Sequence, residues 1–274
     1  MELEYVRQPA VAGRFYPSHP QQLARAVDEY LETSTPPGDV AGAKACIAPH
    51  AGYIYSGSVA GVVYRRLPQR AAFLLLGPNH FGAGSPLAIT SRGSWRTPLG
   101  PAPIDEALAR LLQQNCPGLA EDHLAHAGEH SLEVHLPFLQ RRMKTFSFVP
   151  ILIGDVAFPD LETLGRGLAR ALSGLAEPPL IIASTDMNHY EPDAVTRAKD
   201  QAAVAAILTL DPAGLYEVLR ERHITMCGYG AVIAMLTAVK AMGAREAVLE
   251  NYKTSGDAGG DRRSVVGYAG VIIR

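Results

Sequence analysis

The side chains best suited to chemistry in this sequence are two histidines that each follow an apolar run and a proline. His50 ends Ala45-Cys46-Ile47-Ala48-Pro49-His50, and His80 ends Leu74-Leu75-Leu76-Gly77-Pro78-Asn79-His80. Short apolar runs of this kind predict buried strands, so both histidines are expected at strand ends. Neutral imidazole is a common ligand of Zn, Fe, Cu and Ni. The repeated pattern therefore predicts a metal site, although a single such histidine could equally hydrogen-bond the backbone at its strand end.

A third candidate ligand is Cys227, which precedes a predicted helix in Met226-Cys227-Gly228-Tyr229. The positive end of a helix dipole favours a thiolate, and a thiolate can bind a metal or attack a carbonyl. The alternative is a small buried hydrophobe, which describes most free cysteines. We favour that alternative for Cys46 and Cys116.

Two further polar residues follow another predicted strand, at residues 180–184. Asp186 and His189 lie three positions apart in Thr185-Asp186-Met187-Asn188-His189. They could act in general acid–base catalysis, or they could orient a metal-bound histidine. The alternative is an aspartate that caps a helix beside a surface histidine.

The expected pocket draws on one more motif, Glu129-His130-Ser131-Leu132-Glu133-Val134-His135. His130 and His135 are five positions apart and would not share a helix face, so Glu129 and His130 are expected to reach the pocket from the start of the helix. The predicted pocket comprises Tyr53, Asn79, Glu129, His130 and His135. Tyr53 could equally serve packing, and His123 and His126 are expected in a solvated loop.

The elements that position these residues begin with a strand, a helix and a strand at residues 44–48, 58–67 and 71–76. This order predicts a βαβ unit, with two adjacent parallel strands joined by a right-handed crossover. His50 and His80 would then lie at the carboxyl edge of the sheet, where open α/β folds bind ligands. Further strands are predicted at 146–153, 180–184, 248–255 and 265–273, and further helices at 105–115, 129–143, 160–172, 195–208, 212–222 and 229–242.

Composition excludes several classes of protein. The chain has 274 residues, 47% of them hydrophobic, and a formal net charge of -2. The scattered basic residues do not form the clustered patch that nucleic acid requires. No apolar run approaches the roughly 20 residues of a membrane span, and Met1-Glu2-Leu3-Glu4-Tyr5 does not resemble a signal peptide. Three cysteines indicate a reducing compartment, so we expect a cytoplasmic protein with neither nucleic-acid nor membrane partners.

In order along the chain, these motifs resemble the Memo family, the family of protein B in bacterial AmmeMemoRadiSam gene systems. The resemblance covers almost the whole chain and is carried by the following segments: Val11-Ala12-Gly13-Arg14-Phe15-Tyr16-Pro17, Ala48-Pro49-His50-Ala51-Gly52-Tyr53, Leu76-Gly77-Pro78-Asn79-His80, residues 129–137, Ser184-Thr185-Asp186 with His189, and Cys227-Gly228.

The resemblance implies a fold like that of the class III extradiol (LigB-like) non-haem iron dioxygenases. That fold is a three-layer α/β/α sandwich of the phosphorylase/hydrolase-like type, built around a mixed, largely parallel sheet. It would make residues 1–274 a single domain. The metal site would fall on His50, His80 and Cys227, with Asp186 and His189 as polar neighbours. The dioxygenases have a carboxylate where this chain has Cys227, so the resemblance does not imply ring cleavage.

Three functions follow as expectations. The first is an iron-dependent, dioxygenase-like oxidoreductase of unknown substrate, with Fe(II) as the metal and Zn or Cu as alternatives. In this enzyme His189 would act as acid or base and Asp186 would orient it. The second is a hydrolase that uses Cys227 as nucleophile or a Zn-bound water. The third is a protein without turnover that binds a small molecule or peptide, or that works beside AMMECR-type and radical-SAM partner proteins.

Overall fold

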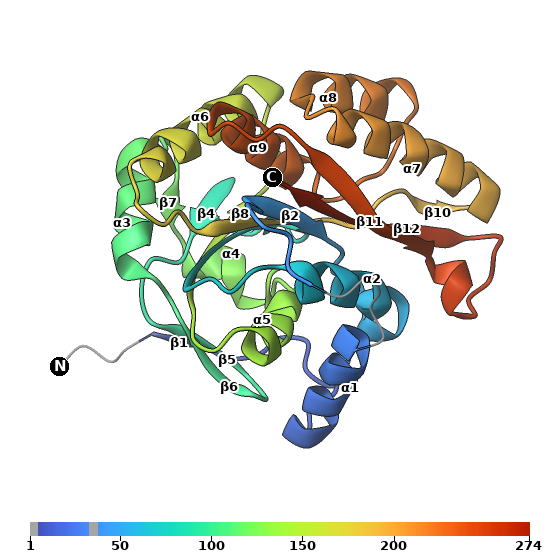
Figure 1. Cartoon of the computed structure of the whole chain (residues 1–274), viewed down its shortest axis with the longest axis horizontal. Coiled ribbons are helices and arrows are strands. Elements are labelled where there is room, and N and C mark those ends of the chain that lie inside the picture. Colours follow the sequence, from blue (N-terminus) through green and yellow to red (C-terminus); the bar gives the residue numbers. More distant parts are fainter. Residues whose placement is uncertain (1–4, 33–37) are drawn as a thin grey trace.

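The computed structural model describes residues 5–32 and 38–274 and is organised around one mixed sheet (Figure 1). Residues 1–4, on which the expected lack of a signal peptide partly depends, lie outside the described part. Within it, the order of strands in this sheet is β10 (His189–Glu191), β12 (Val265–Ile273), β2 (Ala45–Ala48), β9 (Leu180–Ser184), β3 (Ala72–Pro78), β8 (Ser147–Ile153), β4 (Leu87–Ile89) and β7 (Ala120–Glu121), with β11 (Ala247–Thr254) paired to β12. The central strands β2, β9, β3 and β8 are mutually parallel, whereas β12 and β4 run antiparallel to their central neighbours.

Helices cover both faces of the sheet, which confirms the expected three-layer α/β/α architecture (Figure 1). One face carries α3 (Glu106–Asn115), α6 (Phe158–Ser173), α7 (Asp193–Leu208), α8 (Pro212–Glu221) and α9 (Tyr229–Ala241). The other carries α1 (Pro20–Glu32), α2 (Tyr53–Arg66), α4 (His123–Ala127), η1 (Glu133–His135), α5 (Leu136–Arg142) and a small sheet of β1 (Val6–Arg7), β5 (Ser94–Thr97) and β6 (Gly100–Pro103). A short η2 (Ser255–Ala258) follows β11.

The central strands are apolar throughout because both of their faces are covered. In β2, Ala45 and Ile47 join the core cluster on one side of the sheet, while Cys46 and Ala48 join the cluster on the other. Cys46 is therefore a buried core residue, as the sequence indicated, and Cys116 is likewise buried. None of the helices in the described ranges has the length and apolar character needed to cross a membrane.

The predicted adjacency of the first two long strands is wrong. β2 and β3 are parallel, but β9 lies between them and pairs with both. Strand order along a chain does not dictate spatial order, and β9, with every residue buried, takes the central place. The expected consequence still holds, because parallel strands end at the same edge whether or not they are neighbours. His50, His80 and the segment after β9 therefore meet at the carboxyl edge.

Two local predictions around the histidine-rich segment are also wrong. The expected helix over 129–143 begins only at Leu136, after a loop and the 3-10 turn η1, with Pro137 in its first turn. Proline suits that position because its missing N–H has no partner there anyway. Conversely, residues 123–127 are helical because the Asp122 side chain accepts hydrogen bonds from Leu124 N and Ala125 N.

His126, expected in solvent, is fully buried in α4 with its ring edge against Trp95. Burial, and next the charge of Arg7, lower the pKa of His126 to about 3. In the unfolded chain His126 is protonated below about pH 6.5, whereas in the folded chain it stays neutral until the pH approaches 3. This residue leaves stability untouched at neutral pH and reduces it as the pH falls from about 6.5 towards 3.

We predict that His126→Leu flattens the acid side of the stability profile. The free energy of unfolding in urea should fall less steeply for the variant between pH 6 and 4, by up to about 1.4 kcal/mol per pH unit. Leu124→Ala changes an exposed side chain of the same helix and no titrating group, so it should keep the wild-type slope. Equal slopes in wild type and His126→Leu would contradict the prediction.

Candidate metal site at the carboxyl edge of the sheet

His50 follows β2, and Ser184 fixes the orientation of its ring. Its Nδ1 lies 2.7 Å from Ser184 Oγ, and Ser184 donates its only proton to Ser131 O at 2.6 Å. Ser184 must therefore accept from His50, which places the proton on Nδ1 and leaves a lone pair on Nε2. Burial, then the neighbouring His80 and other histidines, lower the pKa of His50 well below its usual value. The ring is thus neutral and available as a ligand.

His80 follows β3 and is oriented by Glu129 from the loop before η1. Glu129 Oε1 lies 2.9 Å from His80 Nδ1, and Oε2 accepts the His80 backbone N–H at 2.7 Å. Burial alone would raise the pKa of Glu129, but the hydrogen bond and charge of His80, with backbone donors, lower it to about 2. A carboxylate on the far nitrogen of a histidine is the usual partner of a metal-bound imidazole.

His130 completes a group of three rings. It stacks on His80 with ring centroids 4.6 Å apart and planes at 14°, and the centroid of the Phe15 ring also lies 4.6 Å from its own. The Nδ1 atom of His130 lies 3.3 Å from Glu129 Oε1, so one carboxylate contacts the rings of both His80 and His130. Burial lowers the pKa of His130 to about 4, although Glu129 opposes the shift.

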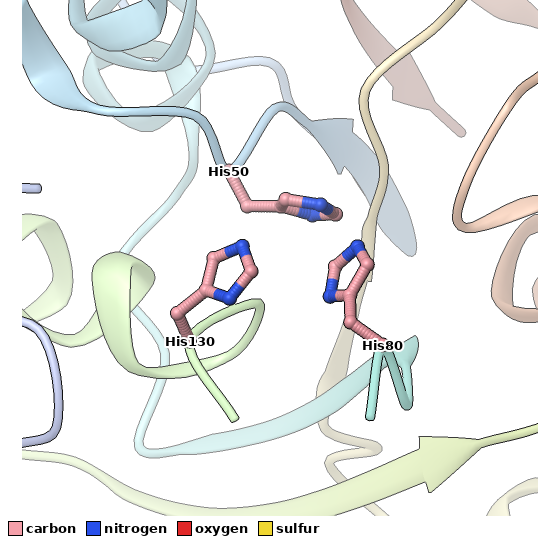
Figure 2. Close-up of side chains that lie close together, drawn as sticks. All are labelled: His50, His80 and His130. Carbon is pink, nitrogen blue, oxygen red and sulfur yellow. The ribbon is translucent and has the colours of Figure 1, made fainter. Parts of the chain in front are cut away.

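The three imidazoles point toward one another (Figure 2). One nitrogen from each of His50, His80 and His130 lies within 4.8 Å of the others. Among the described residues, this is the only group of three or more potential metal-ligating side chains that lie this close together. Imidazole nitrogens in this arrangement suit Zn, Cu, Fe or Ni. The donor chemistry and the orienting groups Ser184 and Glu129 therefore fit a transition metal.

Cys227 lies beside this group rather than in it. Its Sγ is 3.3 Å from His50 Nε2 and accepts a hydrogen bond from Asp186 N at 3.3 Å. Burial, and next the charge of Asp186, raise the pKa of the Cys227 thiol. The sequence singled out Cys227 as the third ligand and His130 as a pocket residue. In the structure His130 groups with His50 and His80, and Cys227 contacts His50.

Asp186 and His189 both line the cavity, but they are not hydrogen-bonded to each other. Asp186 Oδ1 accepts the His50 backbone N–H at 2.8 Å, and burial raises the pKa of this carboxyl to about 7. His189 Nδ1 donates to Thr225 O at 2.8 Å, so its Nε2 carries the lone pair. Burial lowers the pKa of His189. Thr225, not Asp186, orients this histidine.

A cavity of about 700 Å³ opens over the group. Aromatic residues form much of its wall, and Tyr190 adopts the left-handed backbone region at φ 60°, which few non-glycine residues do. The lining residues are Phe15, His50, Ala51, Gly52, Tyr55, His80, His130, Asp186, His189, Tyr190, Thr225, Cys227, Val266 and Tyr268.

The remaining predicted pocket residues do not line this cavity. Tyr53 is buried and donates to Val134 O at 2.6 Å, and Asn79 Nδ2 donates to Ala83 O at 2.7 Å. His135 Nε2 lies 2.8 Å from Ser184 Oγ, and His135 does not line the cavity. Sequence reasoning did not single out Ser184 or Thr225. A serine that closes an all-apolar strand was the available signal for Ser184.

Comparison with known proteins gives a consistent picture. The family model described as Memo-like protein matches residues 7–272. A MEMO1 family protein of Methanosarcina barkeri is 42% identical over 270 residues, covering 98% of this chain and 100% of the relative. One of Methanopyrus kandleri is 41% identical over 282 residues, covering 98% and 99%. One of Methanocaldococcus jannaschii is 40% identical over 287 residues, with the same coverage.

Proposed function

Since this chain belongs to the Memo-like protein family, we propose that it binds a transition metal through His50, His80 and His130 and uses it in redox chemistry on a small molecule or peptide. One observation carries the proposal. Three imidazoles from three different segments bring ligand nitrogens within 4.8 Å of one another. Ser184 orients the ring of His50 and Glu129 orients the rings of His80 and His130, and such orienting partners are the usual surroundings of metal-bound imidazoles.

Fe(II) is the proposed metal, with Cys227 as an additional donor. Nitrogen and sulfur ligands of one tetrahedral ion lie about 3.5 Å apart, given usual metal–ligand bond lengths. The distance from Cys227 Sγ to His50 Nε2, 3.3 Å, is close to this. A coordinating thiol gives up its proton to the metal's charge, which would overcome the raised pKa of Cys227. Without a metal that raised pKa disfavours a thiolate nucleophile.

When bound, the metal would supply a Lewis-acidic, redox-active centre facing the cavity. The chain's own residues would do the rest. His189 offers an unprotonated Nε2 at the cavity and is proposed as the acid or base, with Thr225 O holding its ring. Asp186 fixes the backbone of His50. The aromatic wall around Tyr55, Tyr190 and Tyr268 would exclude water from a bound ligand.

Elemental analysis of tag-free protein purified without oxygen tests this proposal. We expect stoichiometric iron in the wild type and loss of that iron in His50→Ala, because His50 supplies a ligand nitrogen oriented by Ser184. His123→Ala removes a partly exposed histidine outside the group and should retain iron. Bound zinc in place of iron would favour the hydrolase alternative, and a wild type that binds no transition metal under any loading condition would contradict the proposal.

A further inference from the structure

An N-terminal segment far from the metal-site residues in sequence is packed against the loop that carries two of them. This N-terminal arm, residues 6–16, begins with β1, which pairs in parallel with β5. Arg7 in β1 is only 3% exposed, and its guanidinium lies 4.2 Å above the ring of Trp95. A cation so far from solvent needs a structural or functional reason.

The guanidinium of Arg7 donates to three residues of one short stretch, which we call the histidine loop (residues 126–133). Nε donates to His126 O at 2.7 Å, Nη2 to Glu129 O at 2.6 Å, and Nη1 to Glu133 Oε2 at 2.7 Å. The planar fork of arginine has a fixed geometry, so three simultaneous bonds define the curvature of this loop. A lysine ammonium could not reproduce that pattern.

Glu133 ties the rest of the arm to the same loop. Its carboxylate accepts hydrogen bonds from Ala10 N at 2.8 Å, Val11 N at 3.1 Å and the Tyr16 hydroxyl at 2.5 Å, besides the ion pair with Arg7. The side chain is completely buried. Between Arg7 and Tyr16 the arm is therefore joined to the histidine loop at both ends.

The histidine loop carries His130 itself and Glu129, which orients the ring of His80. Arg7 holds the carbonyl of Glu129, while the carboxylate of Glu129 holds the backbone and ring of His80 and the backbone N–H of His130. Phe15, also in the arm, lies against the ring of His130, and its carbonyl accepts from Tyr53 N at 2.8 Å. A shift of Arg7 would therefore move both His130 and the group that orients His80.

We propose that Arg7 is a positioning residue of the metal site, acting through Glu129 and His130. This inference rests on the proposed function. Its physical basis is that a buried arginine–glutamate pair contributes little net stability, because desolvation offsets the attraction, whereas it imposes a defined geometry. The arm thereby forms part of the metal site although none of Arg7, Glu133 and Tyr16 lines the cavity.

Cobalt(II) is a suitable probe because its visible absorption reports the geometry of its ligands. We expect Arg7→Lys, which keeps the charge beside Glu133, to weaken Co(II) binding by about tenfold and to change the absorption spectrum of the bound ion. The control is Leu215→Ala, which removes a buried side chain from the core on the other side of the sheet. It should lose stability yet bind Co(II) with wild-type affinity and spectrum.

The outcomes separate the two proposals. A wild type that does not bind Co(II) would contradict the proposed function itself. Wild-type affinity and spectrum in Arg7→Lys, with normal binding by the wild type, would overturn only the role of Arg7. If Arg7→Lys does not fold, Tyr16→Phe decides, because it removes one hydrogen bond from Glu133. It should weaken binding about threefold with a shifted spectrum, and an unchanged spectrum and affinity would overturn the inference.

Discussion

Replacement of His130 by alanine is expected to lower metal affinity by about a hundredfold or more. Removing a group that only orients a ligand costs about 10–100-fold, and removing a ligand should cost at least as much. His130 belongs to the group of nitrogens within 4.8 Å, and its ring contacts the rings of His80 and Phe15. The loss should therefore exceed that of Arg7→Lys.

Competition titration against a chelator of known affinity measures this effect for Fe(II) and Co(II) under anaerobic conditions. Cys227→Ser is the informative companion, because Cys227 Sγ approaches only His50 Nε2 among the three histidines, at 3.3 Å. Loss of binding in both variants would indicate a four-donor site. Wild-type affinity in His130→Ala together with loss in Cys227→Ser would refute the role of His130 and leave His50, His80 and Cys227 as the ligands.

The second large effect is expected from Gly228→Ala, at the start of α9. A Cβ added to Gly228 would lie 2.2 Å from Ser184 O and 2.7 Å from Thr185 Cβ, and the first of these atoms is backbone. The clash cannot be relieved by a side-chain rotation, so α9 must move away from the end of β9. We expect the free energy of unfolding to fall by about 3 kcal/mol, at the upper end of the usual cost of overpacking.

This substitution should also weaken metal binding, since Ser184 orients His50 and Cys227 directly precedes the substituted position. Urea unfolding and Co(II) titration measure the two effects. Gly174→Ala is the control, because an added Cβ there meets nothing within 4 Å and should leave stability equal or slightly higher. Unchanged stability in Gly228→Ala would show that the close packing of α9 against β9 is not required.

Much of the site was predictable because apolar runs in the sequence indicate strands, and the prolines and polar residues that follow them indicate where the strands end. His50, His80 and the segment with Asp186 and His189 were expected at one sheet edge, and the structure places them there. Their order across the sheet was not predictable, and β9 separates β2 from β3. That order depends on which strands bury most surface together, which is a property of the whole core.

The errors in predicted secondary structure cluster in residues 123–135, where hydrogen bonds from side chains to the backbone determine the backbone conformation. Glu129 Oε1 accepts the N–H groups of His130 and Ser131. These bonds hold the backbone in a loop where the helix was expected to start. Asp122 caps a helix where a loop was expected. Such competition between side-chain and backbone hydrogen bonds depends on partners that are distant in sequence, and His80 is one of them.

The sequence by itself determined the strands, the family resemblance and the chemistry available at the sheet edge. Only the tertiary structure decided that His130 joins His50 and His80, and that Thr225 and not Asp186 holds His189. It also decided that Arg7 bonds Glu129, more than a hundred positions along the chain. The reason is physical. Residue type and spacing determine local structure and reactivity, whereas a metal site requires distances of a few ångströms between segments, and those distances are set by how the whole chain packs.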